Sequence, residues 1–475
     1  MRYLEVHQPE NPFSVLVKGQ TIVEIPQVQL ESGETLHNVP VAFKTWGKLN
    51  KEGTNCMVIC HALTGSSDVV DWWGPLLGKG KAFDPSKFFI VCLNSLGSPY
   101  GSCSPVTRDP TVNELYGPEF PLVSVRDDVN IHRLILDDLG VKQVAIVIGG
   151  SMGGMLALEW CFFGLSYVLN CVVLATSAKH SAWCISWGEA QRQSIYSDPK
   201  YDDGYYPLED PPIQGLGAAR MSALLTYRSR NSFEERFGRG APTPQMREKS
   251  LRTSIIADAH EVPAASEDNC SVHNDGHYSY SSSTKVRSRS LSSGNFSFSG
   301  VKENTSNISN QHGVGQRTRR RPQHYFSAQS YLRYQASKFS QRFDANCYIS
   351  ITRKLDTHDV GRNRPEFHNS TIEALQSLEQ NFLVVGIQSD ALFTYSEQVF
   401  IAKHVKNSKL CKIDSPEGHD AFLLEFEAIN KLILEFEIEH VPELLMQTSD
   451  DSWSDSELGN TKESIFGEVE DPTSW

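Results

Sequence analysis

Short runs of consecutive apolar residues recur along the chain, and each ends in a polar loop that contains glycine. Three of these runs are CMVIC before HALTG, FFIVCLNS before LGSPYGS, and VAIVI before GGSMGG. Apolar runs of this length, separated by helical stretches, are typical of buried parallel strands in a βαβ sheet. The runs NCVVLAT and NFLVVGIQSD continue the pattern. We therefore predict an α/β fold with a mostly parallel sheet flanked by helices.

Two other stretches carry clear local signals. Residues 20–48 alternate β-rich segments around a Ser-Gly-Glu turn, which predicts a hairpin. Residues 124–139 predict a helix that begins with a capping box between Ser124 and Asp127 and stops at Gly140. An antiparallel pair of strands is thus expected ahead of the parallel sheet.

The character of the sequence changes after NCVVLAT. Residues 179–240 are helical and rich in Trp, Tyr, Gln and Arg, whereas residues 245–323 are Ser/Asn-rich and close with RTRRRP. A Ser/Asn-rich segment such as residues 245–323 can bury too little apolar surface to offset the entropy lost on ordering, so we predict that it is disordered. A tolerated insertion is the favoured interpretation, with a regulatory or localisation role as the alternative. The predicted organisation is a first core part at 1–178, a helical lid at 179–345 with the insert at about 245–323, a second core part at 346–445, and an acidic flexible tail at 446–475.

Composition narrows the class of protein. The formal net charge of −13 argues against nucleic acid or an anionic membrane as the main partner. No apolar run approaches the length that crosses a bilayer, and the first residues lack a signal-peptide core. The ten cysteines form no C-x-x-C pair, which fits buried thiols in a reducing compartment, and no metal-ligand motif is present. We expect a soluble, cytoplasmic protein without a metal.

The stretch AIVIGGSMGGMLALEW carries the strongest chemical signal. It matches the G-x-S-x-G nucleophile elbow, with Ser151 between Gly149 and Gly153. A turn this sharp between a strand and a helix lifts the hydroxyl to a helix N-terminus, where free N–H groups favour developing negative charge. The alternative is a glycine-rich turn without chemistry.

A serine nucleophile needs a base and a group that orients the base. His419 follows the last predicted strand in a Pro/Gly-containing loop, and Asp390 ends the strand NFLVVGIQSD. Catalytic groups of open α/β sheets gather at the carboxyl ends of the strands, so Ser151, Asp390 and His419 form the predicted triad. Their chain order is that of α/β-hydrolases. Asp414 and Asp420 compete for the acid, but Asp414 precedes His419 too closely to reach its far side easily.

The predicted oxyanion hole combines two backbone N–H groups. One belongs to Met152, the residue after the nucleophile, and the other to the HALTG loop after an earlier strand. We choose Leu63 as the second donor, with Ala62 or Thr64 as alternatives. A simple βα turn is the non-catalytic interpretation of this loop.

Longer blocks of the sequence resemble the homoserine O-acetyltransferases, in particular the fungal members. The blocks are CHALTGSSDVVDWWGPLLG, LNSLGSPYGSCSP, YGPEFP, GGSMGGMLALEW, SAWCISWGEAQRQSIYSDP, YLRYQASKFSQRFDANCYISITRKLDTHD and SPEGHDAFLLE, and they span nearly all of residues 10–440 except the insert. The resemblance implies an α/β-hydrolase fold with an inserted helical lid. It also implies acetyl transfer from acetyl-CoA, as co-substrate and without a cofactor, to the hydroxyl of L-homoserine in methionine biosynthesis.

The resemblance further implies a ping-pong route through acetyl-Ser151. Arg192 would hold the substrate carboxylate, and Asp420 would meet its amino group. The partners are then small-molecule substrates, and a homodimer is an open expectation because family members are commonly dimers. Serine O-acetyltransferase, homoserine O-succinyltransferase, a carboxylic-ester hydrolase and a non-catalytic binding module remain the alternatives.

Overall fold

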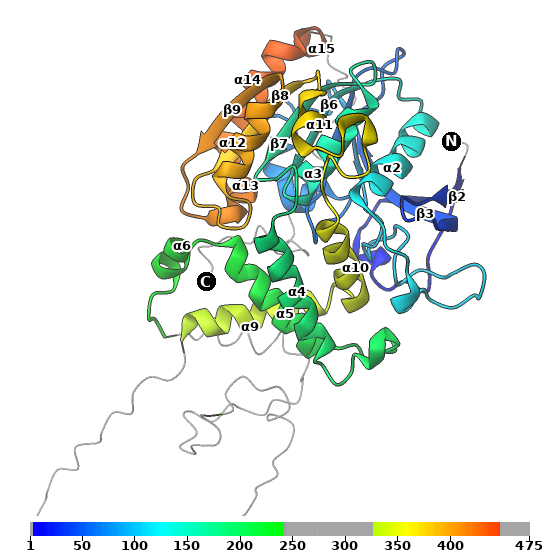
Figure 1. Cartoon of the computed structure of the whole chain (residues 1–475), viewed down its shortest axis with the longest axis vertical. Coiled ribbons are helices and arrows are strands. Elements are labelled where there is room, and N and C mark those ends of the chain that lie inside the picture. Colours follow the sequence, from blue (N-terminus) through cyan, green and yellow to red (C-terminus); the bar gives the residue numbers. More distant parts are fainter. Residues whose placement is uncertain (1–2, 242, 244–272, 274–325, 447–475) are drawn as a thin grey trace, which may run out of the picture.

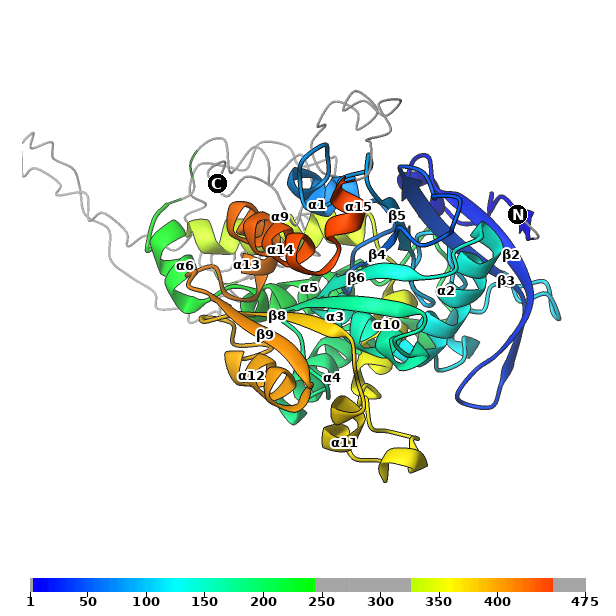
Figure 2. The ribbon, with the colours of Figure 1, turned by 90° about the horizontal axis from the view of Figure 1, so that it is seen from above.

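The computed structural model describes residues 3–241, 243, 273 and 326–446. The predicted insert and acidic tail lie outside these ranges, apart from residues 273 and 446. Within the described part, one sheet runs in the order β1-β2-β3-β5-β4-β6-β7-β8-β9 (Figures 1 and 2). The strands are β1 (Leu4–Glu5), β2 (Thr21–Gln29), β3 (Thr35–Trp46), β4 (Cys56–Cys60), β5 (Phe89–Leu93), β6 (Val144–Gly150), β7 (Val168–Leu174), β8 (Asn381–Ile387) and β9 (Asn407–Ile413).

The strand directions confirm the predicted α/β class. Strands β5, β4, β6, β7, β8 and β9 pair in parallel, whereas β1, β2 and β3 are antiparallel and β3 joins the parallel part through β5. The predicted hairpin is the β2–β3 pair. Residues of β4 alternate between two hydrophobic cores, with Val58 on one side of the sheet and Met57 and Ile59 on the other. Burial on both faces explains why this strand is apolar throughout.

Helices cover both faces of the sheet (Figure 2). One face carries α1 (Val69–Trp73), α14 (Phe426–His440) and α15 (Pro442–Met446), and the other carries α2 (Val125–Leu139), α3 (Met152–Trp160) and α12 (Tyr395–His404). Helix α2 starts with the predicted capping box of Ser124 and Asp127 and ends at Gly140, whose φ of 90° closes the helix. No helix among the described residues is long and apolar enough to span a membrane.

The helices between β7 and β8 form a second group, which Figure 1 shows at one end of the sheet. They are α4 (Ala182–Tyr196), α5 (Ile213–Tyr227), α6 (Arg230–Arg236), α9 (Ser327–Ser340) and α10 (Ala345–Asp356). Helix α5 packs between α4 and α9, and α10 contacts α4. The chain then passes through α11 (Thr371–Gln376) into β8.

The described cysteines are all free thiols. Those of the central strands, Cys56, Cys60, Cys92 and Cys171, are buried as predicted, and burial raises the pKa of each. Cys411 is partly exposed instead, and it lies on β9, the edge strand of the sheet.

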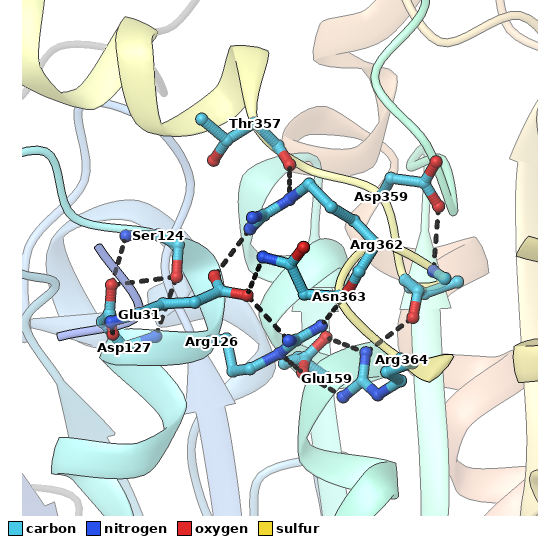
Figure 3. Close-up of polar contacts among 12 residues, drawn as sticks. Glu31, Ser124, Arg126, Asp127, Glu159, Thr357, Asp359, Arg362, Asn363 and Arg364 are labelled. Atoms are coloured by element: carbon cyan, nitrogen blue, oxygen red, sulfur yellow. Dashed lines mark hydrogen bonds and ion pairs between the residues drawn. The ribbon is translucent and has the colours of Figure 1, made fainter. Parts of the chain in front are cut away.

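A network of charged side chains fastens the segment after α10 to the core (Figure 3). Glu31, between β2 and β3, accepts from Arg126 Nη1 at 2.7 Å and from Arg362 Nη2 at 2.6 Å. Glu159 on α3 pairs with Arg126 at 3.0 Å and with the buried Arg364. The segment that follows the inserted helices is thereby joined to α3, the helix directly after Ser151.

In addition to this network, a fully buried ion pair between Lys354 and Asp128 joins α10 to α2. The Lys354 ammonium contacts Asp128 and donates to the Leu96 carbonyl at 2.7 Å, while Asp128 accepts from the Leu96 N–H at 2.7 Å. Both charged side chains have no exposed surface. Each charge therefore depends on the other and on the loop after β5 for its stabilisation.

We expect Lys354→Met to lower the free energy of unfolding by about 3–5 kcal/mol, because it leaves the Asp128 carboxylate buried without its cation. Urea unfolding at neutral pH measures the change. Lys406→Met is the matched control, since Lys406 and Glu379 are 56% and 62% exposed, and its expected effect is below about 1 kcal/mol. Equal effects of the two substitutions would contradict this assignment.

Candidate active site

Ser151 occupies the sharp turn between β6 and α3. Its backbone angles, φ 58° and ψ −126°, are unfavourable for a residue with a side chain. The turn closes only because its neighbours are small: a Cβ on Gly149 would lie 2.0 Å from the Gly153 carbonyl oxygen, and one on Gly153 would lie 2.1 Å from the Cys60 carbonyl oxygen. The glycines therefore permit close packing of α3 against β6 and β4, which fixes the position of the serine.

The structure brings the three predicted triad residues together. The Ser151 hydroxyl lies 2.9 Å from His419 Nε2, and His419 Nδ1 lies 2.7 Å from Asp390 Oδ2. The second Asp390 oxygen accepts from the N–H groups of Leu392 and Phe393 at 2.8 and 3.0 Å. A carboxylate held in this way accepts the Nδ1 proton, which leaves Nε2 free to accept the serine proton.

Two loops at the carboxyl ends of neighbouring strands carry the predicted acid and the predicted base. Asp390 follows β8, and His419 follows β9 in a short 3₁₀ turn, Gly418–Asp420. The imidazole lies among three aromatic rings, with centroids 5.1 Å from Phe422, 5.3 Å from Phe393 and 6.0 Å from Tyr227. The competing acid Asp414 is exposed to solvent, so its side chain has no place beside the buried imidazole.

The triad opens into a pocket between the core and the inserted helices. The pocket encloses about 720 Å³ of empty space, part of it open to solvent. Core loops and helices α4, α5 and α10 form its wall. The lining residues are Ala62, Leu63, Thr64, Ser151, His180, Cys184, Trp187, Gly188, Gln191, Thr226, Tyr227, Thr352, Leu355, Asp356, Leu392, Phe393, His419, Asp420, Phe422 and Leu423.

Comparison with known proteins identifies the family. Residues 55–254 match the alpha/beta hydrolase fold family. A homoserine O-acetyltransferase of Emericella nidulans is 56% identical to this chain over 98% of it and 97% of the relative. The chain belongs to the homoserine O-acetyltransferase family. The fold and family predicted from the sequence are thereby confirmed.

Solved structures are similar at the level of the fold. The homoserine O-acetyltransferase from Bacillus anthracis gives a TM-score of 0.66 at 20% identity, over 88% of this chain and 96% of that one. Esterase E22 gives a TM-score of 0.65 at 20% identity, over 88% and 99%. The same architecture thus occurs in a protein named as a transferase and in one named as an esterase, so the fold alone does not separate these two activities.

One predicted oxyanion donor follows the nucleophile in the chain, and the other lines the same pocket as the nucleophile. Met152 is the first residue of α3, directly after Ser151, and Leu63 lines the pocket together with Ala62 and Thr64. The close approach of Gly153 to the end of β4 brings these two loops together. The choice of Leu63 over its two neighbours stays a prediction.

The two residues expected to bind the homoserine zwitterion differ in exposure to the pocket. Asp420 lines the pocket and pairs with Arg228 Nε at 2.8 Å. Arg192 is 1% exposed, is not among the lining residues, and contacts Glu189 at 2.9 Å and Asp356 at 2.7 Å. Arg192 is thus buried behind Asp356, which is part of the pocket lining.

Sequence reasoning missed several polar groups around this pocket. Burial lowers the pKa of His180 to about 3, so its imidazole is neutral, and burial raises the pKa of Asp356 against the opposing effect of Arg192. Arg220 on α5 is 3% exposed, and its guanidinium lies 5.6 Å from the ring centre of Tyr227. No local motif marks these residues: His180 and Asp356 line the pocket, whereas Arg220 lies behind Tyr227, which lines it.

We expect Asp390→Asn to lower kcat by about 10⁴-fold, because the amide no longer holds the Nδ1–H tautomer of His419. Asp414→Asn is the matched control and should keep a kcat close to that of the unsubstituted protein. Steady-state acetyl transfer with circular dichroism of each variant measures both. The reverse ranking would show that Asp390 is not the orienting acid.

Proposed function

We propose that the chain is a homoserine O-acetyltransferase, which transfers the acetyl group of acetyl-CoA to the hydroxyl of L-homoserine through an acetyl-Ser151 intermediate. The hydrogen-bonded series Ser151, His419 and Asp390 carries the proposal, because it is the arrangement needed to activate a serine. The choice of substrates is supported by full-length relatives that are named homoserine O-acetyltransferase. This places the reaction in methionine biosynthesis.

In the first half of the proposed reaction, Ser151 Oγ attacks the thioester carbon of acetyl-CoA. His419 Nε2 takes the hydroxyl proton, and the N–H groups of Met152 and Leu63 bind the negatively charged oxygen. Collapse of the tetrahedral intermediate breaks the carbon–sulfur bond. The proton on His419 then goes to the departing sulfur, and CoA leaves as a thiol.

In the second half, the homoserine hydroxyl attacks the acetyl-enzyme. His419 removes its proton, the same two N–H groups bind the oxyanion, and the proton returns to Ser151 Oγ as the ester leaves. Water has to be disfavoured as the acceptor. The apolar side chains of Leu392, Phe393 and Leu423 around the triad support this requirement.

The homoserine zwitterion needs an anion for its ammonium and a cation for its carboxylate. Asp420 is the proposed ammonium partner, because it lines the pocket next to His419. Arg192 is the carboxylate partner implied by the family resemblance, but its charge already faces Glu189 and Asp356. Arg220 is a second candidate, since it packs over Tyr227, whose ring lies beside the catalytic imidazole.

The proposal also covers location and assembly. Free cysteines throughout the described residues support a reducing compartment, and we propose the cytoplasm. Acetyl-CoA is the co-substrate, without a bound cofactor. A homodimer is retained as the proposed assembly on the family resemblance alone.

The decisive experiment follows CoA release from acetyl-CoA with homoserine, serine or no amino acid as acceptor. We expect release that depends on homoserine, yields O-acetylhomoserine and vanishes in Ser151→Ala. Mass spectrometry of the quenched protein should detect acetyl-Ser151 when the acceptor is omitted.

Other outcomes of this assay separate the competing functions. Fast CoA release without an amino acid would indicate a hydrolase, and a preference for serine would indicate serine O-acetyltransferase. Transfer from succinyl-CoA in preference to acetyl-CoA would indicate homoserine O-succinyltransferase. The absence of any acyl-enzyme would indicate a binding module.

Substitution of the zwitterion partners should affect the acceptor alone. We expect Asp420→Asn to raise the KM for homoserine about tenfold or more, since a charged hydrogen bond is lost. The rate of Ser151 acetylation by acetyl-CoA should change little. A loss confined to acetylation would contradict the assignment of Asp420.

The two arginines are compared by Arg192→Lys and Arg220→Lys. Lysine keeps the charge but loses the planar pair of donors that matches a carboxylate. The family resemblance implies Arg192 as the carboxylate partner, so we expect Arg192→Lys to raise the KM for homoserine more than Arg220→Lys does. The opposite ranking would favour Arg220.

A further inference from the structure

A buried histidine next to the oxyanion loop has no part in the mechanism above. His61 lies between the end of β4 and the residues Ala62 and Leu63, and it has no exposed surface. Its Nδ1 lies 2.8 Å from the Ala62 carbonyl oxygen, and its Nε2 lies 3.0 Å from the backbone nitrogen of Ser95. Both ring nitrogens are therefore engaged with backbone groups.

The two contacts allow a single form of the imidazole. The Ser95 N–H is only a donor, so Nε2 has to accept and carries no proton. The proton then resides on Nδ1, which donates to the Ala62 oxygen. Burial lowers the pKa of His61 to about 4, against the opposing effect of Asp128, so the ring stays neutral in the working range of the protein.

The contact to Ala62 fixes the peptide that carries the predicted oxyanion donor. In a planar trans peptide the C=O of one residue and the N–H of the next point in opposite directions. The Ala62 oxygen accepts from His61 Nδ1 and also from the Gly65 N–H at 3.0 Å, which occupies both of its lone pairs. The Leu63 N–H is thereby held on the other side of this peptide.

The packing of α3 places the nucleophile on the same loop. A Cβ on Gly153 would lie 2.1 Å from the Cys60 oxygen and 3.0 Å from the His61 oxygen, so the first turn of α3 lies directly against the residues preceding Leu63. Both Leu63 and Ser151 line the pocket. We infer that His61 is a positioning residue, which holds the Ala62–Leu63 peptide so that the Leu63 N–H binds the oxyanion.

This inference rests on the proposed function for the reaction, but its test can be separated from the acceptor. The two amide variants His61→Asn and His61→Gln differ by one methylene. The Asn amide nitrogen reaches the position of Nδ1 and can donate to Ala62, whereas the Gln amide extends to the position of Nε2 and meets only Ser95. Acetylation of Ser151 by p-nitrophenyl acetate requires no homoserine, so it reports on the oxyanion hole by itself.

We expect His61→Gln to lower kcat for acetyl transfer, and the rate of Ser151 acetylation by p-nitrophenyl acetate, by about 100-fold, which is the effect of losing one oxyanion donor. KM values for acetyl-CoA and homoserine should change little. His61→Asn should keep both rates near those of the unsubstituted protein. Thermal unfolding of each variant reports separately on stability.

His132→Gln is the matched control. His132 is also buried, has a pKa lowered to about 4 by burial, and contacts the Asn94 carbonyl oxygen rather than the HALTG loop. Its kcat should therefore stay near that of the unsubstituted protein. Equal losses in His61→Asn and His61→Gln, an unchanged His61→Gln, or an equal loss in His132→Gln would overturn the inference. Absence of acetyl-Ser151 in the unsubstituted protein would instead overturn the proposed function.

Discussion

The tight turn at Ser151 is the constraint on which the site depends. The serine adopts an unfavourable backbone conformation, and it is held there because α3 packs against β6 and β4 with glycine at both contacts. This packing does two things at once. It directs the hydroxyl toward His419 Nε2, and it brings the nucleophile next to the loop that contains Leu63. A single backbone arrangement thus positions both the proposed nucleophile and the loop that carries a proposed oxyanion donor.

The pocket is completed by helices inserted between β7 and β8, and buried charges fix their position. Lys354 on α10 forms an ion pair with Asp128 on α2 and donates to the Leu96 backbone. Lys354 is two residues before Asp356, which ends α10 and lines the pocket. The Arg364 contact to Glu159 holds the segment after α10 against α3, and Arg126 on α2 contacts the same carboxylate (Figure 3). Such pairs add little net stability, but they are costly to break, so the wall and the core keep one relative arrangement.

The buried polar contacts also connect the two sides of the site. Leu96 binds the Lys354–Asp128 pair, and its neighbour Ser95 donates to His61, which in turn holds Ala62. Hydrogen bonds and the Ser95–Leu96 peptide bond therefore connect α10 to the loop that carries the predicted oxyanion donor. The fold is shared by a transferase and an esterase. The fold alone therefore does not separate acyl transfer from hydrolysis.

The sequence by itself determined the sheet, the elbow and the order of the triad, because these depend on local patterns. Apolar runs become strands buried on both faces, glycines allow the turn at Ser151, and Asp390 and His419 follow strands whose carboxyl ends share one edge. Only the tertiary structure decided which carboxylate contacts His419 and that Arg192 is buried against Asp356. It also decided that Asp356 lines the pocket and that Arg220 and His61 contact residues of its lining. Those placements arise because side chains far apart in the chain pack into the same buried volume. Local sequence patterns, such as hydrophobic periodicity or motif spacing, do not reveal these long-range contacts.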